Sequence, residues 1–450
     1  MTVFIADEGG IAPKSGMAAL APRQALASLP PALSAGRMMD TVRALSTPEM
    51  RGRGFGSPEL DRAADLIAAA FREAGLPPAG DTEGSYFQTW EERGGDPPRE
   101  AVMKNVVGTI PGAKSEWAGQ SVVIGAHYDH LGLGWPDVKA GNAGKVHPGA
   151  DDNASGVAVL LELARALGKG WSPDRTVVFA AFSGEEAKRL GSAHYVAAQS
   201  RFPASKCIGM VNLDTVGRLG DGKLLVLGAG SARDWTHIFN GAGYVTRVPV
   251  QPVTDDPGGS DQKSFLDAGV PAVQLFTGPH LDYHTPGDTA DKIDSAGLAK
   301  VAAVAREAID YLAGRAEPLT SSLPSPGAGP PGAKSPPGSQ AGTGSEGPAA
   351  TGSAASEPSA GAPRKAALGT VPDFAYTGSG VRISGVAPGS PAEKAGLRPG
   401  DIIVGLAGSA VTDLRTYAEI LRKLEPGAKV PVTFQRDGKE QTLEVELAAR

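Results

Sequence analysis

Residues 121–130, SVVIGAHYDH, decide the fold of this chain: an apolar, β-branched run ends on polar side chains. The same pattern recurs in RTVVFAAF (175–182) before SGEE, in CIGMVNLD (207–214) and in PAVQLF (271–276), and VVGTI (106–110) and KLLVLG (223–228) are further strand-length runs. Continuous apolar strands are buried on both faces, which is typical of a parallel sheet. We therefore predict an α/β fold with a mixed, largely parallel central sheet covered by helices on both faces.

Helical patterns separate these runs. We predict helices over residues 156–167, 186–198, 261–268 and 295–313, between the apolar strands. An earlier helix is predicted over 58–74, because Ser57 can cap it, Pro58 suits its first turn and Gly75 can end it.

Composition divides the chain into four parts. Residues 1–36 are rich in Ala, Pro and Gly and read as a disordered leader, and 37–315 hold the α/β pattern. Residues 316–366 consist mainly of Pro, Gly, Ser and Ala, which predicts a flexible linker. Residues 367–450 regain apolar periodicity and form a second, smaller domain.

The bulk properties exclude several classes of protein. A formal net charge of −6 gives no support for binding nucleic acid or a membrane surface. No apolar run approaches the roughly 18 residues that a membrane-spanning helix needs. Cys207 is the single cysteine, so no intrachain disulfide can form, and we expect a buried, inert thiol. The N-terminal residues do not resemble a secretory signal, which by itself predicts a cytoplasmic protein.

Histidines and carboxylates gather where the predicted strands end. In open α/β sheets, the loops beyond the carboxyl ends of the strands converge on the ligand crevice. Each such residue alone could be a helix cap or a structural histidine, but the set has the composition of a zinc site. Its members are His127, Asp152, Glu185, Glu186, Asp214 and His284.

The motifs GAHYDHLG, GADDNASG, FSGEE, NLD and YHTPGDT together resemble the two-zinc peptidases of metallopeptidase family twenty-eight, which includes bacterial leucyl aminopeptidases. The resemblance covers roughly residues 40–314 and implies the zinc exopeptidase fold. It also implies two Zn²⁺ ions that are both bound by Asp152. The peptide bond from Asp152 to Asn153 would be cis. The remaining ligands would be His127 and Asp214 for one ion, and Glu186 and His284 for the other.

The same resemblance implies further roles. Asp129 would orient His127, Glu185 would act as general base on the bridging water, and Tyr283 would donate a hydrogen bond to the substrate carbonyl or simply pack. Gln262 stands where the family commonly has histidine, which we expect to alter pocket shape or specificity rather than to abolish catalysis. Members of the family are often secreted or periplasmic, which would apply here if a signal precedes this sequence.

The C-terminal part contains SPAEKAGLRPGDII and resembles a PDZ domain of the bacterial protease type, a small β-barrel-like fold. Such domains capture the free C-terminus of a peptide as an added strand. We expect Gly380 to lie in the carboxylate-binding loop and residues 381–386 to accept the peptide. The predicted groove is lined by Val381, Ile383, Tyr417 and Ile420. A packing module without a peptide ligand is the alternative.

The leading functional prediction is a metallo-aminopeptidase acting on peptide or protein substrates. A carboxypeptidase of the same fold is the nearest alternative, since no residue in the sequence identifies the substrate end. A non-catalytic PDZ scaffold and a single-zinc aminoacyl cyclase remain open as well.

Overall fold

The computed structural model describes residues 33–198, 201–256, 259–323, 365–374, 376 and 378–450. Most of the predicted leader and linker therefore lies outside the described residues. Residues 316–323, which their composition assigns to the linker, instead pack on the α/β domain: Leu319 is buried, and the Arg233 N–H donates to the Thr320 carbonyl. The helix α1 (Ala35–Ser46) begins just inside the predicted leader.

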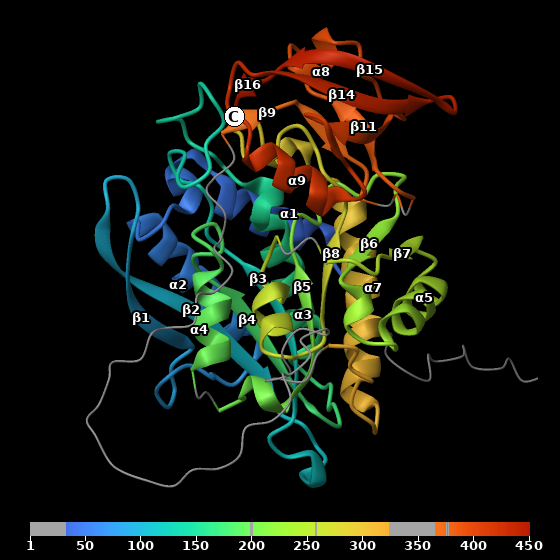
Figure 1. Cartoon of the computed structure of the whole chain (residues 1–450). Coiled ribbons are helices and arrows are strands. Elements are labelled where there is room, and N and C mark those ends of the chain that lie inside the picture. The colour runs from blue at the N-terminus through green and yellow to red at the C-terminus, as the bar shows by residue number, and fades with distance from the viewer. Residues whose placement is uncertain (1–32, 199–200, 257–258, 324–364, 375, 377) are drawn as a thin grey trace, which may run out of the picture. The chain divides into compact units, whose positions relative to one another are not determined.

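An eight-stranded mixed sheet forms the centre of the α/β domain, as predicted (Figure 1). Four adjacent strands in its middle are parallel. The hairpin β1–β2 joins them antiparallel through β2, and β6 joins them antiparallel through β8, with β7 parallel to β6. In spatial order the strands are β1 (Phe87–Gly94), β2 (Arg99–Ile110), β4 (Thr176–Phe182), β3 (Ser121–His127), β5 (Cys207–Leu213), β8 (Ala272–Phe276), β6 (Leu224–Leu227) and β7 (Val250–Pro252).

Alternate residues of the central strands enter two separate hydrophobic clusters, so the sheet is covered on both faces. On β4, Val177 and Phe179 belong to one cluster, whereas Val178 belongs to the other. The larger cluster includes residues of α1, α2 (Pro58–Ala74), α3 (Gly156–Leu167), α5 (Trp235–Thr246) and α7 (Ser295–Gly314). The smaller one includes residues of α4 (Leu190–Ala197) and α6 (Gln262–Asp267).

The local signals for α2 are confirmed. The Leu60 N–H donates to Ser57 Oγ, and Gly75 ends the helix in the left-handed region at φ 80°. In contrast, α4 begins four residues later than predicted. Lys188 and Arg189 have positive φ, at 77° and 61°, so the turn that carries Glu185 and Glu186 is not helical. No helix among the described residues is long and apolar enough to cross a membrane.

The C-terminal domain has its own sheet and its own core. The sheet runs in the order β10 (Thr370–Pro372), β11 (Val381–Val386), β12 (Ile402–Leu406), β14 (Lys429–Arg436) and β15 (Lys439–Glu446), with β13 (Ser409–Ala410) paired to β12. Two short strands, β9 (Ala366–Ala367) and β16 (Ala448–Ala449), pair separately. A turn at Asp437 and Gly438 joins β14 to β15, with φ of 51° and 73°. Helices α8 (Pro391–Lys394) and α9 (Leu414–Arg422) complete the domain.

Candidate metal centre

The predicted ligands lie at the carboxyl ends of the central strands. His127 is the last residue of β3, and Asp214 directly follows β5. Glu185 and Glu186 follow β4, and His284 lies in the loop after β8. Because these strands are parallel neighbours, their ends bring the side chains to one edge of the sheet. Asp152 joins them from the turn before α3.

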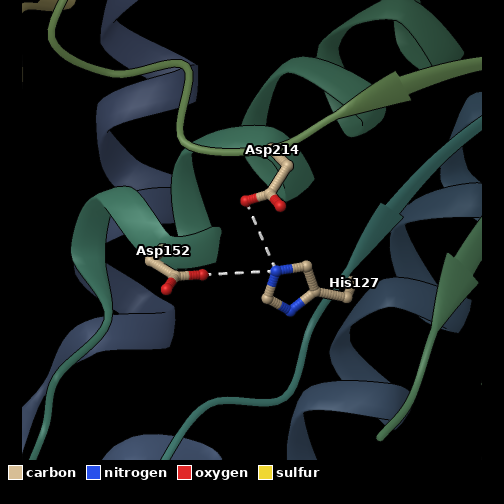
Figure 2. A group of neighbouring side chains, drawn as sticks. All are labelled: His127, Asp152 and Asp214. Atoms are coloured by element: carbon tan, nitrogen blue, oxygen red, sulfur yellow. Dashed lines mark ion pairs between the residues drawn. The ribbon is translucent and has the colours of Figure 1, made fainter. Parts of the chain in front are cut away.

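Two groups of side chains share the Asp152 carboxylate. In the first, His127 Nε2 lies 3.2 Å from Asp152 Oδ1 and 3.4 Å from Asp214 Oδ1 (Figure 2). In the second, His284 Nε2 lies 3.1 Å from Asp152 Oδ2 and 3.2 Å from Glu186 Oε2. The two oxygens of Asp152 therefore face two different histidines, which is the placement that a bridging ligand requires.

The donor set fits a metal cation. His127 Nε2, His284 Nε2 and Asp152 Oδ2 are buried and make no hydrogen bond, although oxygen and nitrogen atoms face one another at these short distances. Burial opposes positive charge on both rings, yet the carboxylates hold the pKa of His127 and His284 well above the usual range. Buried carboxylates in this arrangement call for compensating positive charge, and imidazole and carboxylate groups are ordinary zinc ligands.

The turn carrying Asp152 is fixed by its own hydrogen bonds. The N–H groups of Asp151 and Asp152 donate to Asp288 Oδ2, at 2.9 and 3.0 Å. Asn153 Nδ2 donates to the Leu213 carbonyl at 2.8 Å, which ties this turn to the end of β5. The peptide bond between Asp152 and Asn153 is cis, as the resemblance implied.

Asp129 acts on the glutamate turn as well as on His127. His127 Nδ1 lies 3.2 Å from the Asp129 carbonyl and 3.6 Å from its carboxylate. The carboxylate oxygens accept the N–H groups of Glu185 and Glu186, at 3.0 and 3.3 Å. These bonds hold both glutamates in one non-helical turn, so that Glu186 faces His284 while Glu185 remains outside both ligand groups.

Burial raises the pKa of Glu185 well above its usual range, and the nearby carboxylates of Glu186 and Asp261 act in the same direction. For Glu186, burial also favours the neutral form, but His284 and His130 reverse this effect and lower the pKa to about 2. The pKa values of the two adjacent glutamates are therefore shifted in opposite directions, upward for Glu185 and downward for Glu186. One is suited to accept a proton and the other to remain an anionic ligand.

Two residues that the sequence did not predict contact the ligands. His130 Nδ1 lies 2.7 Å from Glu186 Oε1, and Asp137 Oδ2 lies 2.9 Å from His284 Nδ1. A carboxylate on the outer nitrogen of a metal-binding histidine fixes its tautomer and orientation. HYDH contains His130 only one residue after Asp129, but the spacing alone gave no reason to separate it from a structural histidine.

The predicted substrate-binding residue, Tyr283, stacks on His284 with ring centroids 3.9 Å apart and planes inclined by 16°. Its side chain is partly exposed, at 39%. This position beside the candidate metal centre is compatible with both roles considered for it, so the role in substrate binding remains a proposal.

Gln262 is fully buried in a network of amides and carboxylates. Asn212 Nδ2 donates to Gln262 Oε1 at 3.1 Å, and Gln262 Nε2 donates to Asp256 Oδ1 at 2.9 Å and to Gln274 Oε1 at 3.1 Å. The residue therefore ties α6 to β5 and β8. No predicted metal ligand belongs to this set of contacts.

Arg53 is a buried cation that holds the loops of the site by main-chain contacts. Its guanidinium donates to the carbonyl oxygens of Tyr128 at 2.8 Å, Pro148 at 2.9 Å and Gly149 at 3.0 Å, and also to that of Leu45. Burial lowers its pKa to about 10, against the opposing effect of the nearby carboxylates. The loop after His127 and the loop before Asp152 are thereby fastened to one side chain.

The prediction that residues 381–386 of the C-terminal domain accept a peptide as an added strand is wrong. β11 has hydrogen-bonded neighbours on both sides, β10 and β12, so Val381 and Ile383 cannot pair with an added strand. The edge strand next to β11 is β10, which precedes it in the sequence. Gly380 instead donates its N–H to the Thr412 carbonyl.

Tyr417 and Ile420, which were predicted to line the groove, lie on α9, and Tyr417 faces β10: its hydroxyl is 2.7 Å from Thr370 Oγ1. Tyr417 is buried and Ile420 packs against the domain core. The edge strand that lies beside α9 is therefore β10, not β11.

The chain thus combines an open α/β sheet with a candidate metal centre, rich in histidine and carboxylate groups, at the carboxyl ends of the strands. Residues 105–309 match the family model described as peptidase family M28, and residues 364–447 match a PDZ domain model. The chain therefore contains a peptidase family M28 domain followed by a PDZ domain.

Relatives with similar sequences are named as aminopeptidases or zinc metalloproteases. Aminopeptidase YwaD of Bacillus subtilis is 30% identical over 193 residues, which cover 39% of this chain and 38% of that protein. Several fungal relatives are described as probable zinc metalloproteases. The chain spans about a third of the length of the curated relatives it matches.

Solved structures show the same fold. The zinc aminopeptidase BSAP from Bacillus subtilis matches with a TM-score of 0.52 at 18% identity, over 66% of this chain and 100% of that chain. The glutaminyl cyclase of Porphyromonas gingivalis matches with a TM-score of 0.50 at 19% identity, over 62% and 98%. The fold alone therefore accommodates more than one activity.

Proposed function

We propose that this chain is a zinc-dependent aminopeptidase that binds two Zn²⁺ ions through His127, Asp152, Glu186, Asp214 and His284. The observation that carries the proposal is the Asp152 carboxylate, whose two oxygens each face a different histidine at 3.1–3.2 Å. The names of the relatives, zinc metalloprotease and aminopeptidase, support the metal and the reaction class.

Zinc bound in such a site supplies a Lewis acid, which lowers the pKa of water and stabilises the developing oxyanion of peptide hydrolysis. The chain's own task is to hold and move the proton. Glu185 is placed to accept the proton of the attacking water, because it lies beside the ligands, is not one of them, and has a raised pKa. The same carboxyl group then donates the proton to the leaving amine. Asp129 keeps Glu185 in place through its main-chain N–H.

The assignment of Glu185 is tested by Glu185→Gln. We expect kcat to fall by about 10²–10⁴, the usual contribution of a positioned base, while the zinc content stays unchanged. Glu186→Gln should instead reduce the zinc content, and Glu116→Gln, at an exposed site, should alter neither. Full activity in the Glu185 variant would show that another group takes the proton.

The substrate end is tested with matched peptides. An aminopeptidase should release the first residue from a free peptide and lose this activity when the peptide is N-acetylated. Hydrolysis that survives acetylation but stops on C-terminal amidation would identify a carboxypeptidase instead. Peptides beginning with glutamine test the cyclase alternative, which the similarity of fold to a glutaminyl cyclase raises, because cyclisation releases ammonia without breaking a peptide bond.

For the PDZ domain, we infer binding of peptide C-termini between β10 and α9, with the peptide added to the edge strand. The position of β10 at the edge of the sheet formed by the described residues, and that of Tyr417 beside Thr370, support this site. The full chain carrying Glu185→Gln allows the test without hydrolysis: labelled peptides with a free C-terminus should bind, and their amidated forms should not. Equal binding of both forms, or none, would reject capture of the C-terminus.

A further inference from the structure

His130 is buried in the candidate metal centre, three residues after His127, and is not one of the five ligands that the motifs imply. Its side chain is essentially inaccessible. The rings of His130 and His284 both lie near the Glu186 carboxylate, with their centroids 5.8 Å apart and their planes inclined by 71°. Glu186 therefore has one histidine on each oxygen: His130 at Oε1 and His284 at Oε2.

The two contacts of Glu186 differ in length. Ligand atoms about 2.0–2.2 Å from one zinc ion in tetrahedral geometry are separated from each other by roughly 3.3–3.6 Å. The contacts of His284 Nε2 with Asp152 and Glu186, at 3.1 and 3.2 Å, are close to this separation. His130 Nδ1 lies 2.7 Å from Glu186 Oε1, which is the length of a charge-assisted hydrogen bond. It also lies 3.8 Å from Asp152 Oδ2.

The surroundings of His130 hold the ring in this orientation. Its N–H on the main chain donates to the Arg53 carbonyl at 3.2 Å. The backbone of Gly149 lies close to the ring, because a Cβ at this position would be only 2.6 Å from both Cγ and Cδ2 of His130. Nε2 is buried and has no hydrogen-bond partner among the described residues. Glu186 is thus the polar group toward which the ring is directed.

We propose that His130 is a positioning residue for the metal position formed by Asp152, Glu186 and His284. It donates from Nδ1 to Glu186 Oε1, which leaves Oε2 to face the metal. This inference rests on the proposed two-zinc function. A glutamate without this bond could rotate or bind through both oxygens, so that its geometry would no longer match that of His284 and Asp152. Partners of this kind typically contribute 10–100-fold to metal affinity.

The proposal is tested by zinc binding to the metal-free full chain, measured by competition with a chromophoric chelator and independent of turnover. His130→Phe keeps a ring but removes the donor, and we expect the weaker of two zinc sites to lose 10–100-fold in affinity while the other is unchanged. His130→Asn places an amide near the position of Nδ1 and should recover most of the affinity. His237→Gln, on the exposed side of α5, is the matched control and should behave as the parent chain.

Three results would overturn the proposal. Unchanged zinc affinity in His130→Phe would show that the bond to Glu186 has no effect on the metal. Loss of one bound zinc in both His130 variants would make His130 itself a ligand. Should the phenylalanine variant not fold, His130→Gln takes its place, because its amide reaches toward Nε2 rather than Nδ1, and wild-type affinity there would equally reject the proposal. A parent chain that binds no zinc would instead refute the proposed function.

Discussion

Arg53 offers the sharpest test of how the metal centre is held together. The perturbation is Arg53→Met, which keeps an unbranched apolar chain and removes the guanidinium. Four hydrogen bonds from this charged group to main-chain carbonyls are lost. At about 1.5–3 kcal/mol each, they would contribute roughly 6–12 kcal/mol.

The cost of burying the charge offsets part of this contribution. The pKa of Arg53 is lowered to about 10, a depression worth about 3 kcal/mol at 1.36 kcal/mol per pKa unit. Since methionine also recovers some apolar burial and the loops can relax, we expect the free energy of unfolding to fall by about 3–5 kcal/mol. That loss is a large fraction of the stability of an ordinary domain.

Urea unfolding followed by tryptophan fluorescence isolates this effect. All 5 tryptophans of the chain lie between residues 90 and 235, so their emission reports on the α/β domain and not on the PDZ domain. The measurement is made with a chelator present, which separates folding from metal binding. Arg43→Met is the matched control: Arg43 and its partner Asp40 are 63% and 75% exposed, and a loss below about 0.5 kcal/mol is expected. A loss below about 1 kcal/mol in Arg53→Met, with an unchanged denaturant slope, would refute the reasoning.

Three further predictions follow from individual contacts. Asp137→Ala removes the carboxylate that orients His284 and should weaken zinc binding by about 10–100-fold in a chelator competition, whereas Asp40→Ala should not; equal affinities would rule out this role. Gln262→Leu leaves Asn212, Asp256 and Gln274 without this partner and should cost about 2–4 kcal/mol in urea unfolding; a neutral change would mean that the network contributes little. In the PDZ domain, burial would raise the pKa of Asp401, but its bonds to Arg436 lower it. The stabilisation is therefore complete above the usual carboxyl pKa of about 4 and is lost as the pH falls through the lower folded value, so calorimetry should show this domain melting earlier below about pH 4, and Asp401→Asn should remove that pH-dependent part.

The central sheet and the position of the candidate site could be predicted because they follow from local pattern, whereas the choice of five ligands among the six residues came from the family resemblance. A buried parallel strand requires a continuous apolar run, and the polar residue at its end must lie at the carboxyl edge. His127 and Asp214 are defined in this way by β3 and β5. Glu185 and Glu186 were placed in the right turn, but their conformation depends on a distant carboxylate, Asp129, and so the start of α4 was predicted too early.

Contacts that form only in the folded chain could not be predicted, because they leave no local pattern in the sequence. Asp137 lies in a loop without periodicity, and the position of Arg53 depends on carbonyl groups, which every residue carries. In the PDZ domain, strands β10 and β11 are both short and apolar. Which of them forms the edge depends on the order of pairing in the sheet, which their composition does not reveal.

Gln262 has a consequence for how the candidate metal centre responds to acidity. The family resemblance places a histidine commonly at this position, and an imidazole would change its charge near pH 6.5. An amide has the same charge at every pH. With Gln262 buried between Asn212 and Gln274, these amide-to-amide hydrogen bonds keep their donors and acceptors unchanged as the surroundings become more acidic or more alkaline. Gln262 itself therefore adds no titrating group beside the site, whereas its buried neighbour Asp261 has a pKa raised to about 7 by burial.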